Sequence, residues 1–125
     1  TFSYFHLSDP AGILFFQRVF DLAHQALEQF VNETQLGWSN WFQHPDWAVP
    51  LVHCESHYQA PILSSRIIDI DLSLEKTTTS SLTFQYDIKQ DSKVCCQVST
   101  THVFINKDTK NKIPIPEVVL KIFNS

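Results

Sequence analysis

The chain has 125 residues, a formal net charge of −4, 43% hydrophobic residues and 18% charged residues. This length supports one hydrophobic core, so we expect a single domain over residues 1–125, and the acidic balance argues against a broad nucleic-acid surface. No apolar run approaches the roughly 18 residues of a membrane-spanning helix, and the first residues do not resemble a signal peptide, so we expect a soluble, cytoplasmic protein.

The first part of the chain predicts a short strand and then a long helix. Residues 2–7 are rich in aromatic side chains, which favour a strand. From residue 13 to about residue 32, apolar side chains recur at helical spacing, with polar ones on the opposite side. The apolar positions are Phe16, Val19, Phe20, Ala23, Ala26, Leu27 and Phe30, and the polar ones are Arg18, Asp21, Gln25, Glu28 and Gln29. Such a helix needs a sheet to cover its apolar face.

Four strands are predicted after a loop rich in Trp and Pro. They span residues 51–58, 62–75, 82–88 and 93–105, where β-branched and aromatic residues alternate with polar ones. The side chains expected to point inward are Ile68, Ile70, Leu72, Leu74, Leu82, Phe84, Tyr86 and Ile88. Pro114 and Pro116 then introduce a short C-terminal helix, in which Val119, Leu120 and Phe123 can pack.

This order of elements indicates an α+β domain in which a mostly antiparallel sheet curls around one helix. Two known architectures share the outline, the hotdog fold and the nuclear-transport-factor-like cone. The cone usually begins with helices, whereas the hotdog fold begins with a strand and buries its long helix in the curl. We therefore expect a hotdog fold, with a five-stranded antiparallel sheet wrapped around one long helix and a short C-terminal helix.

Three cysteines, Cys54, Cys95 and Cys96, are too few to form a disulfide framework. Cys95 and Cys96 lie within a predicted strand, where neighbouring side chains point to opposite faces. We interpret them as small core residues in a reducing compartment. A catalytic thiol is the alternative, but no helix start or basic neighbour is evident that would lower its pKa.

The segment of residues 8–16 places Asp9 just before the predicted helix, with Pro10 and Gly12 shaping the turn. A helix start offers unpaired backbone N–H groups and a partial positive charge. A carboxylate beside such donors has the outline of a catalytic pair, namely a nucleophile or base and an oxyanion site. The alternative is that Asp9 merely caps the helix.

These residues resemble the 4-hydroxybenzoyl-CoA thioesterase-like family of hotdog thioesterases. The resemblance covers nearly the whole chain, and its most specific part is the Asp-Pro-Ala-Gly-Ile segment at residues 9–13. Supporting pieces lie at residues 58–62, 103–106 and 114–116. Within the family, the sequence is most similar to the 1,4-dihydroxy-2-naphthoyl-CoA hydrolases of phylloquinone biosynthesis.

The resemblance implies an acyl-CoA thioesterase with Asp9 as the catalytic carboxylate, acting as nucleophile or general base. It also implies that the backbone N–H of Phe16 polarises the thioester carbonyl, and that Gly12 lies in the turn where a Cβ would crowd the substrate. Family members pair their sheets, so a homodimer or homotetramer with sites at the subunit interface is expected. The sequence departs from related enzymes at residues 17–21 and 63–65. At these positions it lacks residues that have a functional role in those enzymes.

An aromatic acyl group is expected for the CoA substrate, because Trp38, Trp41 and Trp47 can supply a flat apolar wall. The alternative is that these rings anchor the loop or a subunit contact. Arg66, Lys107, Lys110 and Lys112 are candidates for meeting the CoA phosphates, although lysines in a polar turn are usually only solvated.

Neither a cofactor nor a metal is expected. His53 and His57 are about 13 Å apart along a strand, at about 3.3 Å per residue, too far to share an ion. The remaining alternatives keep the shape and change the function. One is a non-catalytic ligand-binding domain, and another is a thioesterase for 4-hydroxybenzoyl-CoA or a short acyl-CoA. A hotdog dehydratase would need a His-containing motif near the helix that is absent from the sequence.

Overall fold

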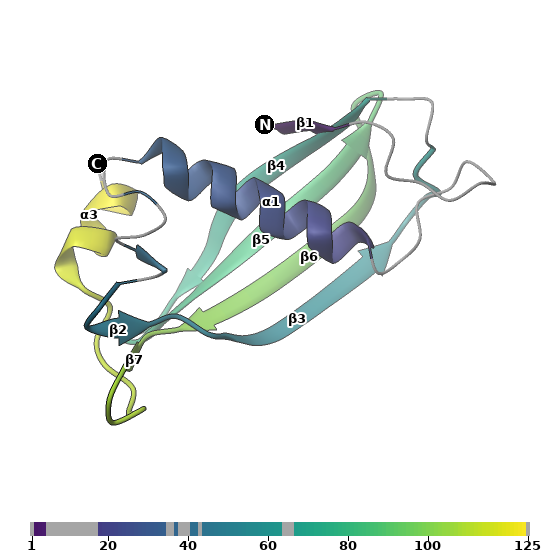
Figure 1. Cartoon of the computed structure of the whole chain (residues 1–125). Coiled ribbons are helices and arrows are strands. Elements are labelled where there is room, and N and C mark those ends of the chain that lie inside the picture. Colours follow the sequence, from purple (N-terminus) through teal and green to yellow (C-terminus); the bar gives the residue numbers. More distant parts are fainter. Residues whose placement is uncertain are drawn as a thin grey trace.

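The computed structural model describes residues 2–4, 18–34, 37, 41–42, 44–63 and 67–124. A five-stranded antiparallel sheet lies along one long helix, with strands in the order β1-β4-β5-β6-β3 (Figure 1). The elements are β1 (Phe2–Tyr4), α1 (Arg18–Glu33), β2 (Trp47–Ala48), β3 (Leu51–Tyr58), β4 (Ile68–Thr77), β5 (Ser81–Gln90), β6 (Lys93–Val103), β7 (Ile105–Asn106) and α3 (Glu117–Asn124). This arrangement is the predicted hotdog fold.

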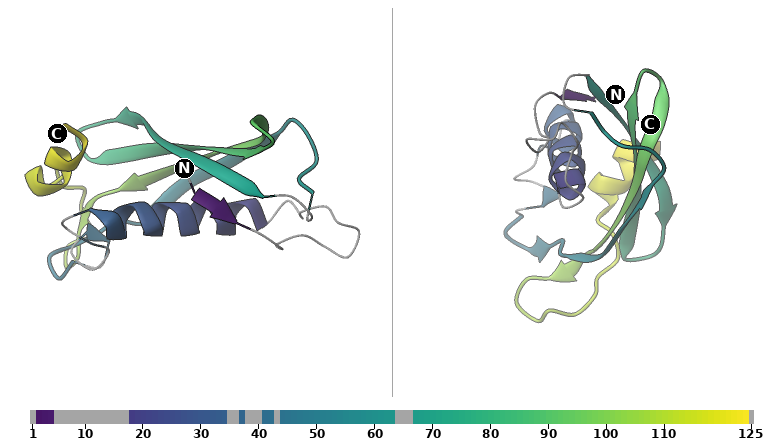
Figure 2. Two further views of the ribbon diagram at one scale, coloured as in Figure 1. Left: turned by 90° about the horizontal axis from the view of Figure 1, so that it is seen from above. Right: turned by 90° about the vertical axis from the view of Figure 1, so that its right-hand side faces the viewer.

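Helix α1 lies on one face of the sheet and α3 lies beyond its C-terminal end (Figure 2). The fully buried side chains of α1 are Val19, Leu22, Ala23, Ala26, Leu27 and Val31. The predicted apolar stripe is therefore confirmed in outline, although Phe20 and Phe30 are only partly buried. The Phe30 ring lies 6.1 Å from the ring of Phe123 in α3, so it covers the end of the helix and not its centre.

The inward faces of β4 and β5 match the predicted alternation. Leu82, Phe84, Tyr86 and Ile88 are buried on β5, and Ile68 and Ile70 are buried on β4. The second of the predicted strands begins later than expected, at Ile68 rather than residue 62. The backbone of Leu63 instead pairs with the buried side chain of Gln90, which accepts from the Leu63 N–H at 2.9 Å and donates to its carbonyl at 2.7 Å.

Cys95 and Cys96 do not point to opposite faces, because a β-bulge interrupts β6 beside them. Ile88 pairs with Cys96 and Lys89 with Val94, which leaves Cys95 without a partner on β5. A bulge breaks the alternation of side chains, and both cysteines are buried. The Cys95 carbonyl accepts from the backbone N–H groups of Gln59 and Ala60 at 2.8 and 3.1 Å, so the bulge also holds the loop after β3.

An aromatic cluster closes the end of the core near α3. The Trp41 ring is completely buried, stacks on Phe42 at 5.4 Å and meets Phe123 edge-on at 5.5 Å. Val119 of α3 is buried, and Leu120 and Phe123 pack partly buried beside it, as predicted for this helix. A two-stranded ribbon of β2 and β7, which the sequence did not predict, borders the same end (Figure 1).

A chain of three polar side chains crosses the buried face of β5 and β6. The Tyr86 hydroxyl and the Thr100 hydroxyl are 2.7 Å apart, and His102 Nε2 lies 3.2 Å from the same Thr100 oxygen. Burial, with a smaller contribution from His24, lowers the pKa of His102 from 6.5 to about 4. The imidazole is therefore neutral in the folded protein at neutral pH.

We expect His102 to make the protein acid-sensitive. The unfolded chain binds this proton near pH 6.5 and the folded chain near pH 4, so stability falls as the pH drops through that window. The free energy of unfolding should decrease by about 2 kcal/mol between pH 7.5 and pH 5 through this group alone. Urea titrations at both pH values should show that His102→Gln loses that part of the dependence. An unchanged pH dependence in the variant would contradict the assignment.

Candidate functional site

The predicted catalytic residues precede the described part of α1. Asp9, Gly12 and Phe16, together with Trp38 and Arg66, lie outside the described residues, so their roles stay predictions. The structure describes what surrounds the start of the helix. Arg18 begins α1 at the same end of the sheet as the last residues of β3 and β5 and the first residues of β6 (Figure 1).

The loop after β3 lies at this end of the sheet, and hydrogen bonds fix it at two points. The bulge carbonyl of Cys95 holds Gln59 and Ala60, and the Gln90 side chain holds Leu63. This loop contains the Tyr-Gln-Ala-Pro-Ile segment at residues 58–62. The sequence alone did not indicate that Gln90, 27 positions away from Leu63, would position the loop.

Tyr58 and Cys96 occupy paired positions on β3 and β6 at this end. Burial, and then the neighbouring Cys96, raises the pKa of Tyr58 to about 12. Burial is also the largest cause that raises the pKa of the Cys96 thiol to about 11. Both groups are protonated at neutral pH, which argues against Cys96 as a thiolate nucleophile.

The two described tryptophans lie at the other end of the molecule and are engaged by protein contacts. Trp41 is completely buried, and its carbonyl accepts from Trp47 Nε1 at 2.7 Å. The Trp47 ring stacks on His44 at a centroid distance of 3.6 Å. These contacts support the alternative that both rings anchor the loop.

The three candidate lysines lie in and after the turn that follows β7, at the end of the molecule opposite to the start of α1 (Figure 1). Lys107 Nζ donates to the His44 carbonyl at 3.2 Å, and Lys110 Nζ donates to the Lys107 carbonyl at 2.7 Å. Lys112 forms a bridge with Ile105 through its backbone. Within one protomer, the structure therefore does not bring these lysines together with the helix start.

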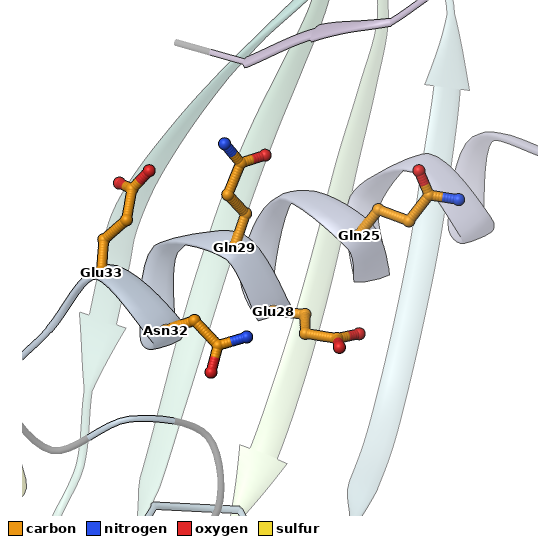
Figure 3. A pocket seen from close by; sticks show the side chains of 5 residues that line it. All are labelled: Gln25, Glu28, Gln29, Asn32 and Glu33. Carbon is orange, nitrogen blue, oxygen red and sulfur yellow. The ribbon is translucent and has the colours of Figure 1, made fainter.

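A shallow groove of about 450 Å³ follows the exposed face of α1 (Figure 3). The described side chains that line it come from the helix and are Gln25, Glu28, Gln29, Asn32 and Glu33. Glu28 lies 3.8 Å from His24 one turn earlier. The sequence predicted this face as the polar side of the helix, and none of the described residues that line the groove is a predicted site residue.

Among the strands that the structure describes, β3 forms an edge of the sheet, because β6 is its one neighbour in the strand order. Leu51, Val52 and Tyr58 are exposed by 52%, 56% and 41%. The sequence predicted the strand but not its place at the edge. The polar and charged residues within this strand were the available signal, because charged side chains are typical of sheet edges.

The described residues hold neither a membrane-spanning helix nor a cluster of metal-ligating side chains. No helix there is long and apolar enough to cross a membrane. No group of three or more His, Cys, Asp or Glu side chains within the described ranges is arranged to hold a metal ion.

Comparison with known proteins assigns the family. The model of the thioesterase-like superfamily matches residues 5–123. A 1,4-dihydroxy-2-naphthoyl-CoA hydrolase from Rippkaea orientalis is 26% identical over 121 residues, which cover 94% of this chain and 88% of the relative.

Solved structures confirm the fold. A 1,4-dihydroxy-2-naphthoyl-CoA thioesterase from Synechocystis has a TM-score of 0.88 at 22% identity, covering 99% of this chain and 94% of that one. A gentisyl-coenzyme A thioesterase has a TM-score of 0.82 at 20% identity and covers both chains completely (100%).

We expect Gln90 to hold the loop after β3. In Gln90→Met the Leu63 backbone loses both of its hydrogen bonds to the Gln90 side chain, which should lower the free energy of unfolding by about 1–2 kcal/mol. Amide hydrogen exchange at residues 59–63 should also accelerate. Gln85→Met, the same change on the outer face of β5, is the control and should leave exchange in this loop unaltered. Equal exchange in the two variants would show that Gln90 does not position the loop.

Proposed function

The chain belongs to the thioesterase-like superfamily, and we propose that this enzyme hydrolyses 1,4-dihydroxy-2-naphthoyl-CoA to 1,4-dihydroxy-2-naphthoate and CoA in phylloquinone (vitamin K1) biosynthesis. The observation that carries the proposal is the end-to-end similarity to a hydrolase named for that substrate, over 94% of this chain and 88% of the relative. The Asp-Pro-Ala-Gly-Ile segment at residues 9–13 supports the thioesterase chemistry, whereas the choice of acyl group rests on the general similarity.

Hydrolysis of a thioester needs few catalytic groups, because the carbonyl carbon of a thioester is more electrophilic than that of an oxygen ester. In one route the Asp9 carboxylate attacks the carbonyl carbon, the C–S bond breaks, and water hydrolyses the resulting mixed anhydride. In the other route Asp9 removes a proton from the attacking water. In both, the Phe16 backbone N–H donates to the developing oxyanion and Gly12 leaves room for the substrate.

The first test is thiol release from a panel of CoA esters. The panel contains 1,4-dihydroxy-2-naphthoyl, 4-hydroxybenzoyl, benzoyl and straight-chain acyl groups. We expect the highest kcat/KM for the naphthoyl ester, and a loss of about 10²–10⁴-fold in kcat for Asp9→Asn. Asp21→Asn, in the exposed first turn of α1, is the matched control and should keep the parent rate.

The other outcomes each point to a different conclusion. Faster release from another ester would keep the thioesterase and change its substrate. An Asp9→Asn variant with parental turnover would remove the catalytic assignment. If no ester were cleaved, the domain would be a ligand-binding module with Asp9 as a helix cap. Label on Asp9 after a single turnover in heavy-oxygen water would establish the anhydride route with attack of water at the aspartyl carbonyl, because the general-base route labels only the product.

We also propose that the enzyme works as a homodimer or homotetramer with its sites at subunit interfaces. The exposed edge of β3 supports an assembly through this strand. Sites at an interface would also allow the lysines of one protomer to approach substrate held by another.

The turn lysines are proposed to attract the CoA phosphates. Replacing Lys107, Lys110 and Lys112 together with Ala should raise KM for the CoA ester roughly 3- to 10-fold and weaken its dependence on salt, with kcat unchanged. Lys76→Ala, which removes an exposed lysine from the end of β4, is the control. An unchanged KM in the triple variant would assign these lysines to the turn alone.

A further inference from the structure

Three large apolar side chains are exposed at the end of the sheet where α1 begins. Tyr58, Leu63 and Ile67 are 41%, 37% and 49% exposed. Tyr58 ends β3 and Ile67 immediately precedes β4, so the three side chains follow the connection between these two strands (Figure 1). We call these three residues the apolar rim. Because the exposure of apolar surface to water is unfavourable, a group of such side chains indicates contact with an apolar ligand.

The backbone that carries the apolar rim is fixed to the sheet. The carbonyl of Cys95 accepts from two backbone N–H groups of the loop after β3, and the side-chain amide of Gln90 binds both backbone polar groups of Leu63. The side chain of Ile62 is buried in the core with 1% exposure, whereas that of the next residue, Leu63, stays exposed. Leu63 is therefore held in an exposed position by the structure around it, as a binding surface requires.

Tyr58 adds a polar group to the apolar rim. It stands opposite Cys96, which belongs to the buried core. Directly opposite residues of an antiparallel pair point to the same face, so Tyr58 points to the face that α1 covers. Its phenol is protonated at neutral pH, because burial raises its pKa to about 12. A protonated phenol can both donate and accept a hydrogen bond.

The loop after β3 suits an aromatic ring better than the amide chain of CoA. The backbone N–H groups of Gln59, Ala60 and Leu63 already donate within the protein. Pro61 has no N–H, so at most the N–H of Ile62 remains in this loop for a ligand. A pantetheine arm needs partners for its amides, because a buried polar group without a partner costs free energy. A flat ring needs only apolar contact and a partner for each of its hydroxyl groups, and the apolar rim supplies both.

We propose that the apolar rim binds the acyl ring of the substrate, with Leu63 and Ile67 against the ring and the Tyr58 hydroxyl hydrogen-bonded to a ring hydroxyl. The inference rests on the proposed thioesterase function and specifies how its substrate is selected. In a 1,4-dihydroxy-2-naphthoyl group, the 1-hydroxyl lies beside the carbonyl and can donate to it. The 4-hydroxyl lies on the far side of the ring, so it is the hydroxyl that needs Tyr58 as its partner.

Calorimetric binding of 4-hydroxy-2-naphthoate and 2-naphthoate tests the apolar rim without turnover. Leu63→Ala and Ile67→Ala should each raise the dissociation constant of both acids roughly 3- to 10-fold, because the ring loses apolar contact. Leu63→Ala keeps the backbone hydrogen bonds to Gln90, so the loop stays in place. Tyr58→Phe should raise the dissociation constant roughly 3- to 10-fold for 4-hydroxy-2-naphthoate alone. Val118→Ala, on α3 with 46% exposure, is the control and should change neither affinity.

Thiol release extends the same comparison to the reaction. With 1,4-dihydroxy-2-naphthoyl-CoA, Leu63→Ala and Tyr58→Phe should raise KM by a similar factor and leave kcat unchanged, because the ring contact is the same in the ground state and the transition state. With benzoyl-CoA, which has no ring hydroxyl, Tyr58→Phe should leave KM unchanged. A loss of kcat without a change in KM would contradict a role in binding the ring.

The other outcomes separate the apolar rim from the assembly and from the activity. Absent binding of both acids to the parent, or unchanged affinity in every rim variant, would overturn the inference. Equal weakening of the two acids by Tyr58→Phe would overturn the hydrogen bond to the ring hydroxyl. If sedimentation shows that Leu63→Ala loses the assembly of the parent, Leu63 lies at a subunit contact and its role with the ring is overturned. Weaker binding in the variants, together with no thiol release by the parent, would keep the apolar rim and reject the proposed hydrolysis.

Discussion

The packing of α1 onto the concave face of the sheet is the interaction on which the rest of the structure depends. Val19, Leu22, Leu27 and Val31 are completely or almost completely buried there, and full burial of such a side chain contributes about 1.5–3 kcal/mol. Ala23 and Ala26 add no bulk between helix and sheet, so the backbones can approach closely. Because the helix is held along its whole length, its first turn has a defined place at one end of the sheet.

The two ends of the sheet differ in the residues that lie there. The aromatic cluster around Trp41 and Phe123 closes one end with α3, and the His102 ring meets Phe42 edge-on at 5.5 Å beside it. At the other end lie the helix start, the β6 bulge and the loop that Gln90 holds. Between them, the Tyr86–Thr100–His102 chain is neutral and hydrogen-bonded, which is how a core accommodates polar groups.

The free edge of β3 links the fold to the proposed assembly. Backbone groups and apolar side chains that a single protomer leaves exposed become favourable contacts once a second copy is present. The same contact would bring residues of two protomers to one site, as the family resemblance implies. The polar face of α1 remains outside the core, and the shallow groove along it is a consequence of that amphipathic pattern.

The features that could be read from the sequence alone are those set by near neighbours along the chain. Helical spacing identified the buried face of α1, and two-residue alternation identified the inward side chains of β4 and β5. The helix start beside Asp9 stays a prediction, because that segment lies outside the described residues. The tertiary structure alone decided the bulge that turns both Cys95 and Cys96 inward, the hold of Gln90 on Leu63, the burial of Trp41 and the edge position of β3. These features depend on which distant segment pairs with which, and periodicity within a segment carries no information about its partners.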